Sequence, residues 1–172
     1  HSTETAVLQV NSDLLQAVDS GNVAVLVLLD LSAAFDTVDH NFLLRRLSVS
    51  CGISGKVLDW FTSYLTKRTQ FVLYNDVRSS ILDIECGVPQ GSVLGPLLFT
   101  LYTAGVTQLV QKHGLGSHLY ADDTQIYGSC TLRQLEALQL QVSGCLDDVS
   151  CWMASNRLQL NESKTEVMWV GS

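Results

Sequence analysis

Hydrophobic residues recur along the chain at two different spacings, and the spacing predicts the elements of the first quarter. Residues 3–20 carry apolar side chains at every third or fourth position, which predicts a helix. Gly21 follows where the end of such a helix is expected. Residues 23–29 form a continuous aliphatic run of strand length, which is typical of a strand that is buried on both faces.

The middle of the chain predicts two helices followed by a hairpin. Residues 38–50 and 55–66 have helical patterns, and the second carries a bulky apolar face. Residues 70–74 and 80–86 have strand character, and the turn-prone pair at 75–76 lies between them.

The second half predicts alternating helical and extended elements. A glycine-rich loop at 87–92 interrupts the pattern, and Thr131 with Gln134 has the spacing of a capping box at the start of a helix. The expected elements are a helix at 93–112, a hairpin at 117–128 around an acidic turn, a helix at 131–154 and a strand at 166–170.

Without the segment 38–86, the predicted order is β-α-β-β-α-β. This is the order of a ferredoxin-like split unit, with the segment 38–86 inserted after the first strand. The expected fold class is therefore α+β, with an antiparallel sheet that has helices on one face. We expect residues 1–172 to form a single domain.

The composition limits the classes of protein. The 172 residues are 47% apolar and carry a net charge of −7, so the chain is expected to fold around a hydrophobic core. The longest aliphatic run, at 23–29, is much shorter than the roughly 18 residues of a membrane span, so no membrane contact is expected. Five scattered cysteines without zinc-ligand spacing predict reduced, mostly structural thiols, no zinc and an intracellular protein.

Three carboxylates follow apolar strand segments. Asp30 ends the run at 23–29, and Asp122 with Asp123 follows the apolar residues 119–121. In a split β-α-β-β-α-β unit the first strand lies beside the hairpin, so these carboxylates are expected to meet and to need a cation between them. Oxygen ligands of this kind suit Mg²⁺, and two such ions would support phosphoryl transfer. The alternative is an ordinary strand end and a polar turn.

Four linked motifs resemble those of reverse transcriptases. The segment Tyr120-Ala121-Asp122-Asp123 resembles their catalytic aromatic-x-Asp-Asp motif, and residues 29–36 resemble their first aspartate motif. Residues 87–96 resemble the Pro-Gln-Gly motif, and Asn161 with Lys164-Thr165 resembles the lysine motif that follows it. The sequences of these motifs are most similar to those of retrotransposons without long terminal repeats, of the long interspersed element type.

The resemblance implies a two-metal centre. It implies that Asp30 and Asp122 bind two Mg²⁺ ions, for which Mn²⁺ is a possible substitute, and that Asp123 completes the acidic cluster. The backbone carbonyl of Leu31 would be a further metal ligand. Lys164 matches the lysine proposed to protonate the pyrophosphate leaving group.

The resemblance also implies a nucleotide and template site. Phe35 matches the aromatic residue that packs under the sugar and excludes a 2′-hydroxyl, and the alternative is a core phenylalanine. Gln90 matches the residue that touches the incoming nucleotide and the template, and Gly91 and Ser92 would lie along the template strand. Tyr120 is the aromatic residue of the catalytic motif and is assigned to the same binding site.

The implied activity is that of an RNA-templated DNA polymerase. The implied partners are an RNA template, a DNA primer and deoxynucleoside triphosphates, in the nucleus or the cytoplasm. The match covers the palm and part of the fingers. The earlier finger motifs and the thumb are expected outside the 172 residues, and an endonuclease domain could accompany them. Asp36 lies within the segment that resembles the first aspartate motif, but the sequence assigns no role to it.

Other functions stay open at this level. The chain could be a catalytically inert or repurposed retroelement fragment that acts at most as an interaction module. A serine hydrolase would use Ser92 with His113 or His118, but the Gly-x-Ser-x-Gly spacing is absent. A P-loop at 87–92 is excluded because no lysine follows the glycines.

Overall fold

The structure is a computed structural model that describes residues 3–171. The chain, expected to form one domain, is divided into two compact units. The first unit combines the N-terminal segment His1–Ser32 with Thr103–Ser172, and the second unit is the intervening segment Ala33–Tyr102.

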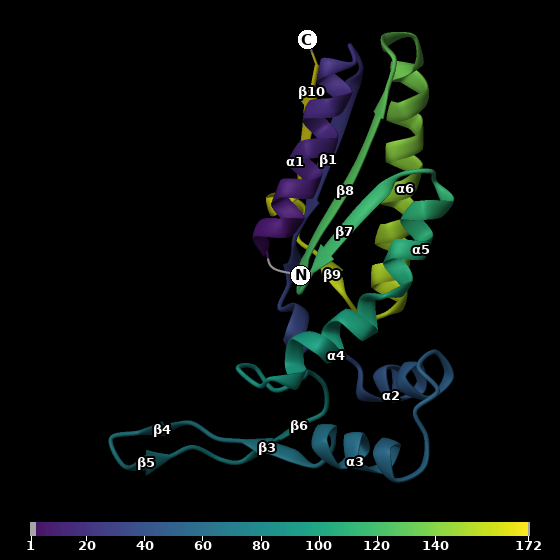
Figure 1. Cartoon of the computed structure of the whole chain (residues 1–172). Helices are drawn as coiled ribbons and strands as arrows, with labels where there is room; N and C mark the ends of the chain where they lie inside the picture. Colours follow the sequence, from purple (N-terminus) through teal and green to yellow (C-terminus); the bar gives the residue numbers. More distant parts are fainter. Residues whose placement is uncertain (1–2, 172) are drawn as a thin grey trace. The chain divides into compact units, whose positions relative to one another are not determined.

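The first unit is built on a four-stranded sheet (Figure 1). Its strands are β1 (Val23–Leu29), β7 (Gly116–Tyr120), β8 (Asp123–Cys130) and β10 (Glu166–Val170). They lie in the order β10-β1-β8-β7, and every neighbouring pair is antiparallel. The predicted strands at 23–29 and 166–170 are confirmed.

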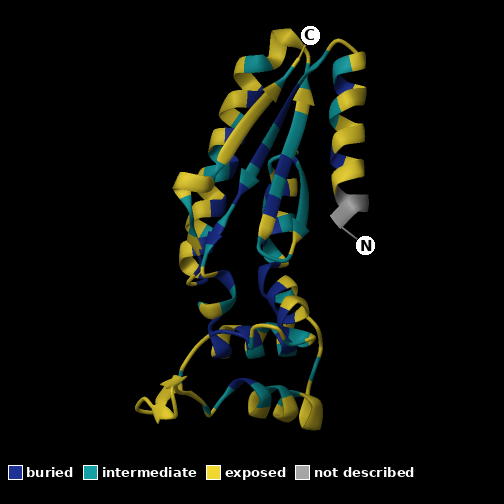
Figure 2. Cartoon of the chain, turned by 90° about the vertical axis from the view of Figure 1, so that its left-hand side faces the viewer, coloured by how far each residue is buried: buried dark blue, intermediate teal, exposed yellow. Residues whose placement is uncertain are grey.

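Helices cover both faces of this sheet (Figure 2). On one face lies α1 (Thr3–Asp19), whose Asp13 is hydrogen-bonded to Tyr127 of β8. On the other face lie α5 (Gly105–Lys112) and α6 (Leu135–Ser155), and Leu138 of α6 packs under Gly128. The predicted arrangement with helices on one face only is therefore wrong. The apolar run of β1 leaves aliphatic side chains on both faces, and burying them requires cover on each side.

The helix boundaries of the first unit follow local signals except at one position. Gly21 ends α1 with a φ of +73°, as predicted. The capping box of Thr131 and Gln134 precedes α6 through a short 3₁₀ helix, η2 (Leu132–Gln134). The single helix predicted at 93–112 is wrong, because α4 (Leu94–Thr103) ends before α5 begins at Gly105. The Trp152 indole packs so closely here that a Cβ on Gly105 would lie 3.1 Å from it, a contact that periodicity cannot report.

The second unit contains the short 3₁₀ helix η1 (Ala34–Asp36), α2 (His40–Val49), α3 (Gly55–Leu65), most of α4 and an extended hairpin. The predicted helices at 38–50 and 55–66 are confirmed with slightly shorter bounds. The core consists of side chains with 0% to 1% exposure, namely Leu43, Leu47, Leu65, Leu98, Phe99 and Tyr102. The Asp39 side chain caps α2 by accepting a hydrogen bond from the backbone N–H of Phe42.

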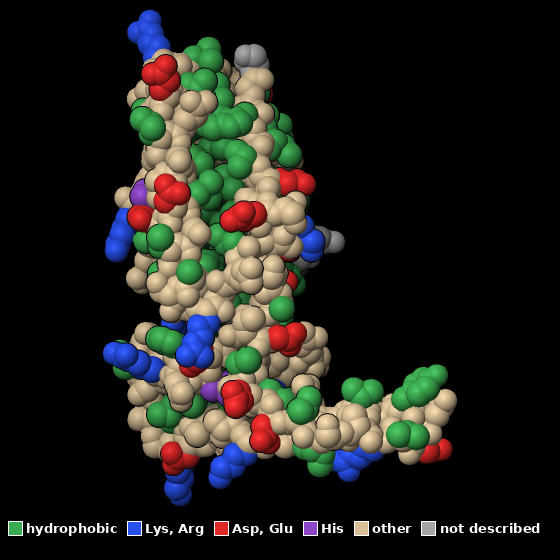
Figure 3. Space-filling view, turned by 180° about the vertical axis from the view of Figure 1, so that it is seen from behind, with side chains coloured by type: hydrophobic (Ala, Val, Ile, Leu, Met, Phe, Trp, Pro, Cys, Tyr) green, Lys and Arg blue, Asp and Glu red, His purple; other side chains and the backbone are tan. Residues whose placement is uncertain are grey.

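The hairpin is formed by two successive short ladders. The pair β3 (Arg68–Gln70) and β6 (Leu82–Ile84) is continued by the pair β4 (Leu73–Tyr74) and β5 (Val77–Arg78). The turn at 75–76 is confirmed, and both turn residues have positive φ. The predicted strands are too long, because the ladder is interrupted between the two pairs. Hydrophobic side chains along this hairpin are exposed to solvent (Figure 3).

Short elements complete the first unit where sequence patterns gave no signal. They are β2 (Leu31–Ser32), β9 (Gln159–Leu160) and the 3₁₀ helix η3 (Glu162–Lys164), and β2 pairs with β9.

All five cysteines are free, but three of them are exposed, so the expectation of mostly structural thiols is wrong. Among the helices of residues 3–171, none is sufficiently long and apolar to cross a membrane.

Candidate active site

The strand register of the first unit brings three carboxylates to one end of its sheet. Leu29, the last residue of β1, is paired with Thr124 of β8. Asp30 follows Leu29 directly, and Asp123 precedes Thr124, so the two residues continue the same antiparallel register. Asp122 lies in the turn between β7 and β8, where Tyr120 is paired with Asp123. Strand pairing therefore brings Asp30 beside Asp123, and Asp122 lies next to Asp123 in the turn.

The turn that carries Asp122 has an unusual backbone. Ala121 has a φ of +52°, in the left-handed region that a non-glycine residue seldom adopts. Such a conformation costs of order 1–3 kcal/mol and is found where surrounding structure imposes it, commonly at functional sites. The acidic turn predicted from the sequence is confirmed, but its two turn residues are Ala121 and Asp122, and Asp123 already belongs to β8.

Two of the carboxylates act electrostatically on the third. Burial raises the pKa of the Asp123 carboxyl above its ordinary value, and the negative charges of Asp122 and Asp30 raise it further. Like charges that are close destabilise the ionised form, so the group is easier to keep ionised when a cation is present. This end of the sheet therefore favours the binding of positive charge.

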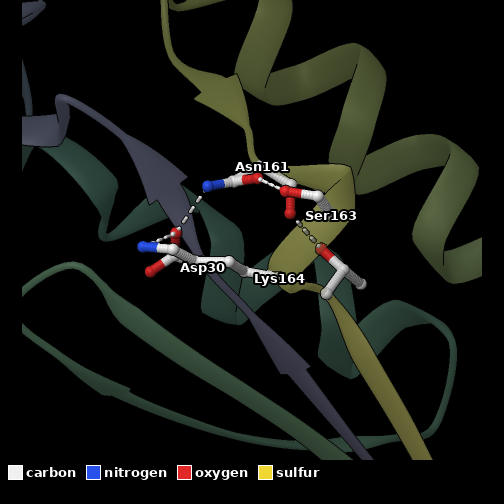
Figure 4. A network of polar contacts seen from close by, with 5 residues as sticks. Asp30, Asn161, Ser163 and Lys164 are labelled. Carbon is white, nitrogen blue, oxygen red and sulfur yellow. Dashed lines mark hydrogen bonds and ion pairs between the residues drawn. The ribbon is translucent and has the colours of Figure 1, made fainter.

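Two side chains from the C-terminal segment already contact Asp30 (Figure 4). The ammonium nitrogen Nζ of Lys164 lies 3.4 Å from Oδ2 of Asp30. Nδ2 of Asn161 donates a hydrogen bond of 3.2 Å to the same oxygen. The Lys164 side chain is 67% exposed, so its ion pair with Asp30 is screened by solvent and can be exchanged for a contact with a ligand.

Asn161 is a residue for which the sequence motif gave no role. The pairing of β2 with β9 places Leu31 opposite Leu160, and the backbone N–H of Asn161 donates to the carbonyl of Asp30 over 2.9 Å. Ser163 in turn donates to Oδ1 of Asn161 over 2.7 Å, which fixes the Asn161 amide with its nitrogen toward Asp30. A two-residue ladder between segments about 130 positions apart has no periodic signal, so no sequence pattern could have revealed it.

The carboxylates fit a hard divalent cation by their chemistry. Carboxylate oxygens are the ligands that Mg²⁺ prefers, and the mutual repulsion of these three groups is relieved by such an ion. Within residues 3–171, however, no three His, Cys, Asp or Glu side chains are already arranged as a ligand group. Leu31, whose carbonyl the resemblance adds to the ligands, is buried directly after Asp30.

Of the predicted nucleotide and template residues, Phe35, Gln90, Gly91 and Ser92 lie in the second unit, whereas Tyr120 is the last residue of β7 in the first unit. Gln90, Gly91 and Ser92 belong to a loop whose backbone is bonded to the segment of η1. The backbone N–H of Val88 donates to the carbonyl of Phe35 over 2.8 Å, and the N–H of Gly87 donates to the carbonyl of Val38 over 2.8 Å. The Gly87 carbonyl accepts hydrogen bonds from His40 Nε2 and from the Arg68 guanidinium. These bonds join Gly87 and Val88 to Phe35, near the end of the first aspartate motif, and to residues 38, 40 and 68.

Phe35 and the loop line a common cavity. The cavity has a volume of about 350 Å³ and is lined by Phe35, Pro89, Gln90, Gly91, Ser92, Gly95 and Pro96. The Phe35 ring also packs against the buried ring of Phe99, with centroids 5.0 Å apart. Phe35 is half-buried: its ring packs against Phe99 and also lines the cavity, and its role toward a sugar stays a prediction.

The Ser92 side chain forms two hydrogen bonds with backbone groups at the start of α4. Its Oγ donates to the carbonyl of Pro89 over 2.6 Å and accepts a hydrogen bond from the N–H of Gly95 over 3.0 Å. In the described part of the chain, no histidine is hydrogen-bonded to Ser92, and Nε2 of His113 is paired with Asp148 at 2.8 Å. The serine hydrolase alternative therefore has no geometric support.

Sequence comparisons relate the whole chain to one family. The pattern of the family described as reverse transcriptase (RNA-dependent DNA polymerase) matches residues 2–171. The RNA-directed DNA polymerase from mobile element jockey of Drosophila funebris is 30% identical over 171 residues, which cover 95% of this chain and 18% of that protein. The probable RNA-directed DNA polymerase from transposon BS of Drosophila melanogaster is 30% identical over 170 residues, again covering 18% of the relative. The chain thus spans about a fifth of these relatives.

Solved structures give the same fold. Apo telomerase from Candida tropicalis, truncated from its C-terminal domain, matches 100% of this chain and 36% of its own with a TM-score of 0.72 at 16% identity. Telomerase from Candida albicans in complex with a fragment of telomeric RNA matches 98% of this chain and 30% of its own with a TM-score of 0.68 at 15% identity. At these identities the likeness establishes the fold and nothing more.

Proposed function

The chain belongs to the reverse transcriptase (RNA-dependent DNA polymerase) family, and on this premise we propose that it forms the palm of an RNA-templated DNA polymerase. The proposed reaction is the attack of a primer 3′-hydroxyl on the α-phosphate of a deoxynucleoside triphosphate, with release of pyrophosphate. The proposed partners are an RNA template and a DNA primer, inside the cell in the nucleus or the cytoplasm.

The sheet of the first unit supports this interpretation. A ferredoxin-like β-α-β-β-α-β unit places its fourth strand beside the first, and the third strand between the first and the second. The observed order β10-β1-β8-β7 has this arrangement when these strands are counted along the chain and the short β2 and β9 are set aside. In such a palm, the first strand and the central hairpin end beside each other, which is where the carboxylates lie.

The metal-binding groups in this proposal are Asp30, Asp122 and Asp123, with the backbone carbonyl of Leu31. They would hold two Mg²⁺ ions, which Mn²⁺ could replace. When bound, such a pair of ions stabilises the charge on the attacking and the leaving oxygen of an in-line phosphoryl transfer. The three carboxylates would hold the ions in place and balance their positive charge. Asn161 keeps Asp30 in position through its 3.2 Å hydrogen bond.

The remaining residues act on the nucleotide and the leaving group. Phe35 presents its ring to the sugar and leaves no room for a 2′-hydroxyl, while Gln90 makes a polar contact with the nucleotide. Gly91 and Ser92 follow along the template strand, and Tyr120 borders the acidic turn with 43% of its surface exposed. Lys164 leaves Asp30 and donates a proton from Nζ to the pyrophosphate.

The net charge of −7 limits what this segment does alone. Binding to a phosphate backbone draws on clustered Lys and Arg, and this chain has ten cations against seventeen acidic residues. We therefore assign the main grip on the template and primer to fingers, thumb and other parts of the parent protein. The alternative of an inert fragment is not favoured, because the carboxylates, Asn161 and Lys164 converge at one end of the sheet.

The observation that supports the proposal is the strand register: Leu29 is paired with Thr124, so Asp30 and Asp123, which come from separate sequence motifs, lie beside each other at one end of the sheet. The raised pKa of the Asp123 carboxyl, to which the charges of Asp122 and Asp30 contribute after burial, agrees with this proximity. The test is Mg²⁺-dependent extension of a DNA primer on an RNA template by the purified chain. Asp122→Asn keeps the side-chain volume but weakens metal binding, and it is expected to lower extension at least roughly 100-fold. Asp147→Asn is the matched control, because Asp147 is an exposed aspartate on α6, outside the acidic end of the sheet.

A second measurement does not depend on turnover. Titration with Mn²⁺ is expected to broaden the NMR signals of Asp30, Asp122 and Asp123 selectively, because the paramagnetic ion relaxes only nearby nuclei. Extension that is equal in wild type and Asp122→Asn would refute the assignment of the metal site. A folded chain that binds Mn²⁺ at these residues but extends no primer would show that turnover needs the missing parts.

A further inference from the structure

Asp36 is an exposed carboxylate whose structural partner is Gln90. It is the last residue of η1, and it lies 54 positions before Gln90. Nε2 of Gln90 donates to both carboxylate oxygens of Asp36, over 3.2 Å to Oδ1 and 3.3 Å to Oδ2. A bifurcated contact with one ionised group restrains the end of an otherwise flexible side chain.

The chemistry of the two groups decides which way the amide faces. An ionised carboxylate only accepts hydrogen bonds, whereas an amide has a donor nitrogen and an acceptor oxygen. The nitrogen of Gln90 must therefore face Asp36. Among the described residues none donates a hydrogen bond to Oε1 of Gln90. The oxygen is left available as an acceptor.

The backbone around this contact is rigid. The N–H of Asp36 donates to the carbonyl of Ala33 over 2.9 Å, and Val88 is bonded to Phe35 across the two segments. Gly87 adopts a φ of +85°, and a Cβ on it would lie 3.0 Å from both Cα and the carbonyl oxygen of Asp36. The loop therefore approaches η1 more closely than any side chain at position 87 would permit, and this approach brings Gln90 within reach of Asp36.

Gln90, like Pro89, lines two cavities of the second unit. Asp36 and Gln90 both line a cavity of about 710 Å³, which also includes Arg68 and Asp83. Gln90 lines the smaller cavity of about 350 Å³ together with Phe35, but Asp36 does not. The carboxylate therefore holds the amide nitrogen on a residue that lines the larger cavity, and the amide oxygen, which accepts no hydrogen bond among the described residues, belongs to a side chain that also lines the smaller cavity.

We propose that Asp36 is a positioning residue that fixes Gln90 as a hydrogen-bond acceptor for the nucleotide. This inference rests on the proposed function, because it assumes that the cavity with Phe35 takes a deoxynucleoside triphosphate. The sugar of such a ligand carries one hydroxyl group, at the 3′ position, and a hydroxyl is a suitable donor to Oε1. Asp36 does not touch the nucleotide and acts on its binding through Gln90.

The contact is tested first in the free protein by NMR of the Gln90 side-chain amide. In the wild type, the two amide protons are expected to resonate at positions different from those of a glutamine without a hydrogen-bonded partner. Asp36→Ala removes this signature. Asp83→Ala is the matched control, since Asp83 is an exposed carboxylate of the same cavity without a hydrogen bond to Gln90. The isosteric Asp36→Asn provides a second variant if Asp36→Ala loses its fold.

Ligand binding tests the consequence. The affinity for 2′-deoxyadenosine 5′-triphosphate is expected to fall about threefold to tenfold in Asp36→Ala, as for loss of one exposed polar contact. The affinity for the 2′,3′-dideoxy analogue, which lacks the hydroxyl, is expected to stay within twofold of the wild type, roughly the noise of such a titration. A general structural defect would lower both affinities equally, so the ratio separates positioning from destabilisation.

Each outcome is decisive. An amide signature that is the same in wild type and Asp36→Ala overturns the proposal, and so does an unchanged preference for the deoxynucleotide after the signature is lost. Loss of the signature with loss of the preference supports it. If neither nucleotide binds to any of the proteins, the nucleotide role of the cavity is refuted, and the proposal falls with it even when the amide signal shows that Asp36 orients Gln90.

Discussion

Gly87→Ala is expected to destabilise the second unit far more than the same change four residues later. Gly87 has a φ of +85°, and a Cβ there would lie 3.0 Å from backbone atoms of Asp36 and Phe35. Gly91 has a similar φ of +73°, but nothing lies within 4 Å of the place where its Cβ would be. The two positions therefore separate the cost of backbone conformation from the cost of crowding.

The magnitude follows from these two contributions. An alanine in the left-handed region costs about 1–2 kcal/mol, and this cost applies to both variants. Forcing an extra methyl group against a packed backbone costs a further 1–3 kcal/mol or thereabouts, and only Gly87→Ala bears it. The free energy of unfolding should therefore fall by about 2–5 kcal/mol in Gly87→Ala and by about 1–2 kcal/mol in Gly91→Ala.

Urea unfolding followed by far-ultraviolet circular dichroism measures both values. For small proteins the slope is about 1–3 kcal/mol per molar urea, so the two midpoints should differ by roughly 1 M. Equal midpoints for the two variants would contradict the close approach of the loop to η1. They would also remove the geometric basis for the contact between Asp36 and Gln90.

Three further perturbations test other parts of the fold. Ile126→Ala, at a side chain with 1% exposure, should lower the free energy of unfolding by about 2–5 kcal/mol in the urea titration. The control Leu140→Ala, at a side chain with 76% exposure, should change it by less than about 0.5 kcal/mol. Thr131→Ala removes the capping box before α6 and should cost about 0.5–2 kcal/mol, measured by thermal unfolding with circular dichroism. Burial raises the pKa of the Cys145 thiol to about 11, so iodoacetamide at pH 8 should modify exposed Cys51 and leave Cys145 intact in the native protein, as mass spectrometry would show. Because the folded state keeps this thiol neutral, its contribution to stability is complete below the ordinary thiol pKa near 9 and is lost as the pH rises toward 11.

The carboxylate end of the first unit illustrates what sequence reasoning could reach. Asp30 and Asp122 follow apolar runs, and an ionised group at such a position is costly unless it is paired, so the residues themselves indicate a site. Their meeting also follows from the predicted element order, because strand pairing in that order has few solutions. The contacts of Asn161 with Asp30 and of Gln90 with Asp36 could not be foreseen, since each depends on the rotamers of polar side chains from distant segments.

The sequence by itself determined the elements that depend on local interactions. The end of α1 at Gly21, the turn at 75–76 and the capping box at Thr131 each depend on residues within one turn of each other, and all three are present. The tertiary structure alone decided the two-sided cover of the sheet, the separation of α4 from α5 beside Trp152, and the pairing of β2 with β9. These features arise from contacts between segments far apart in the chain, where the free energy of burial and packing outweighs local preference and leaves no periodic trace in the sequence.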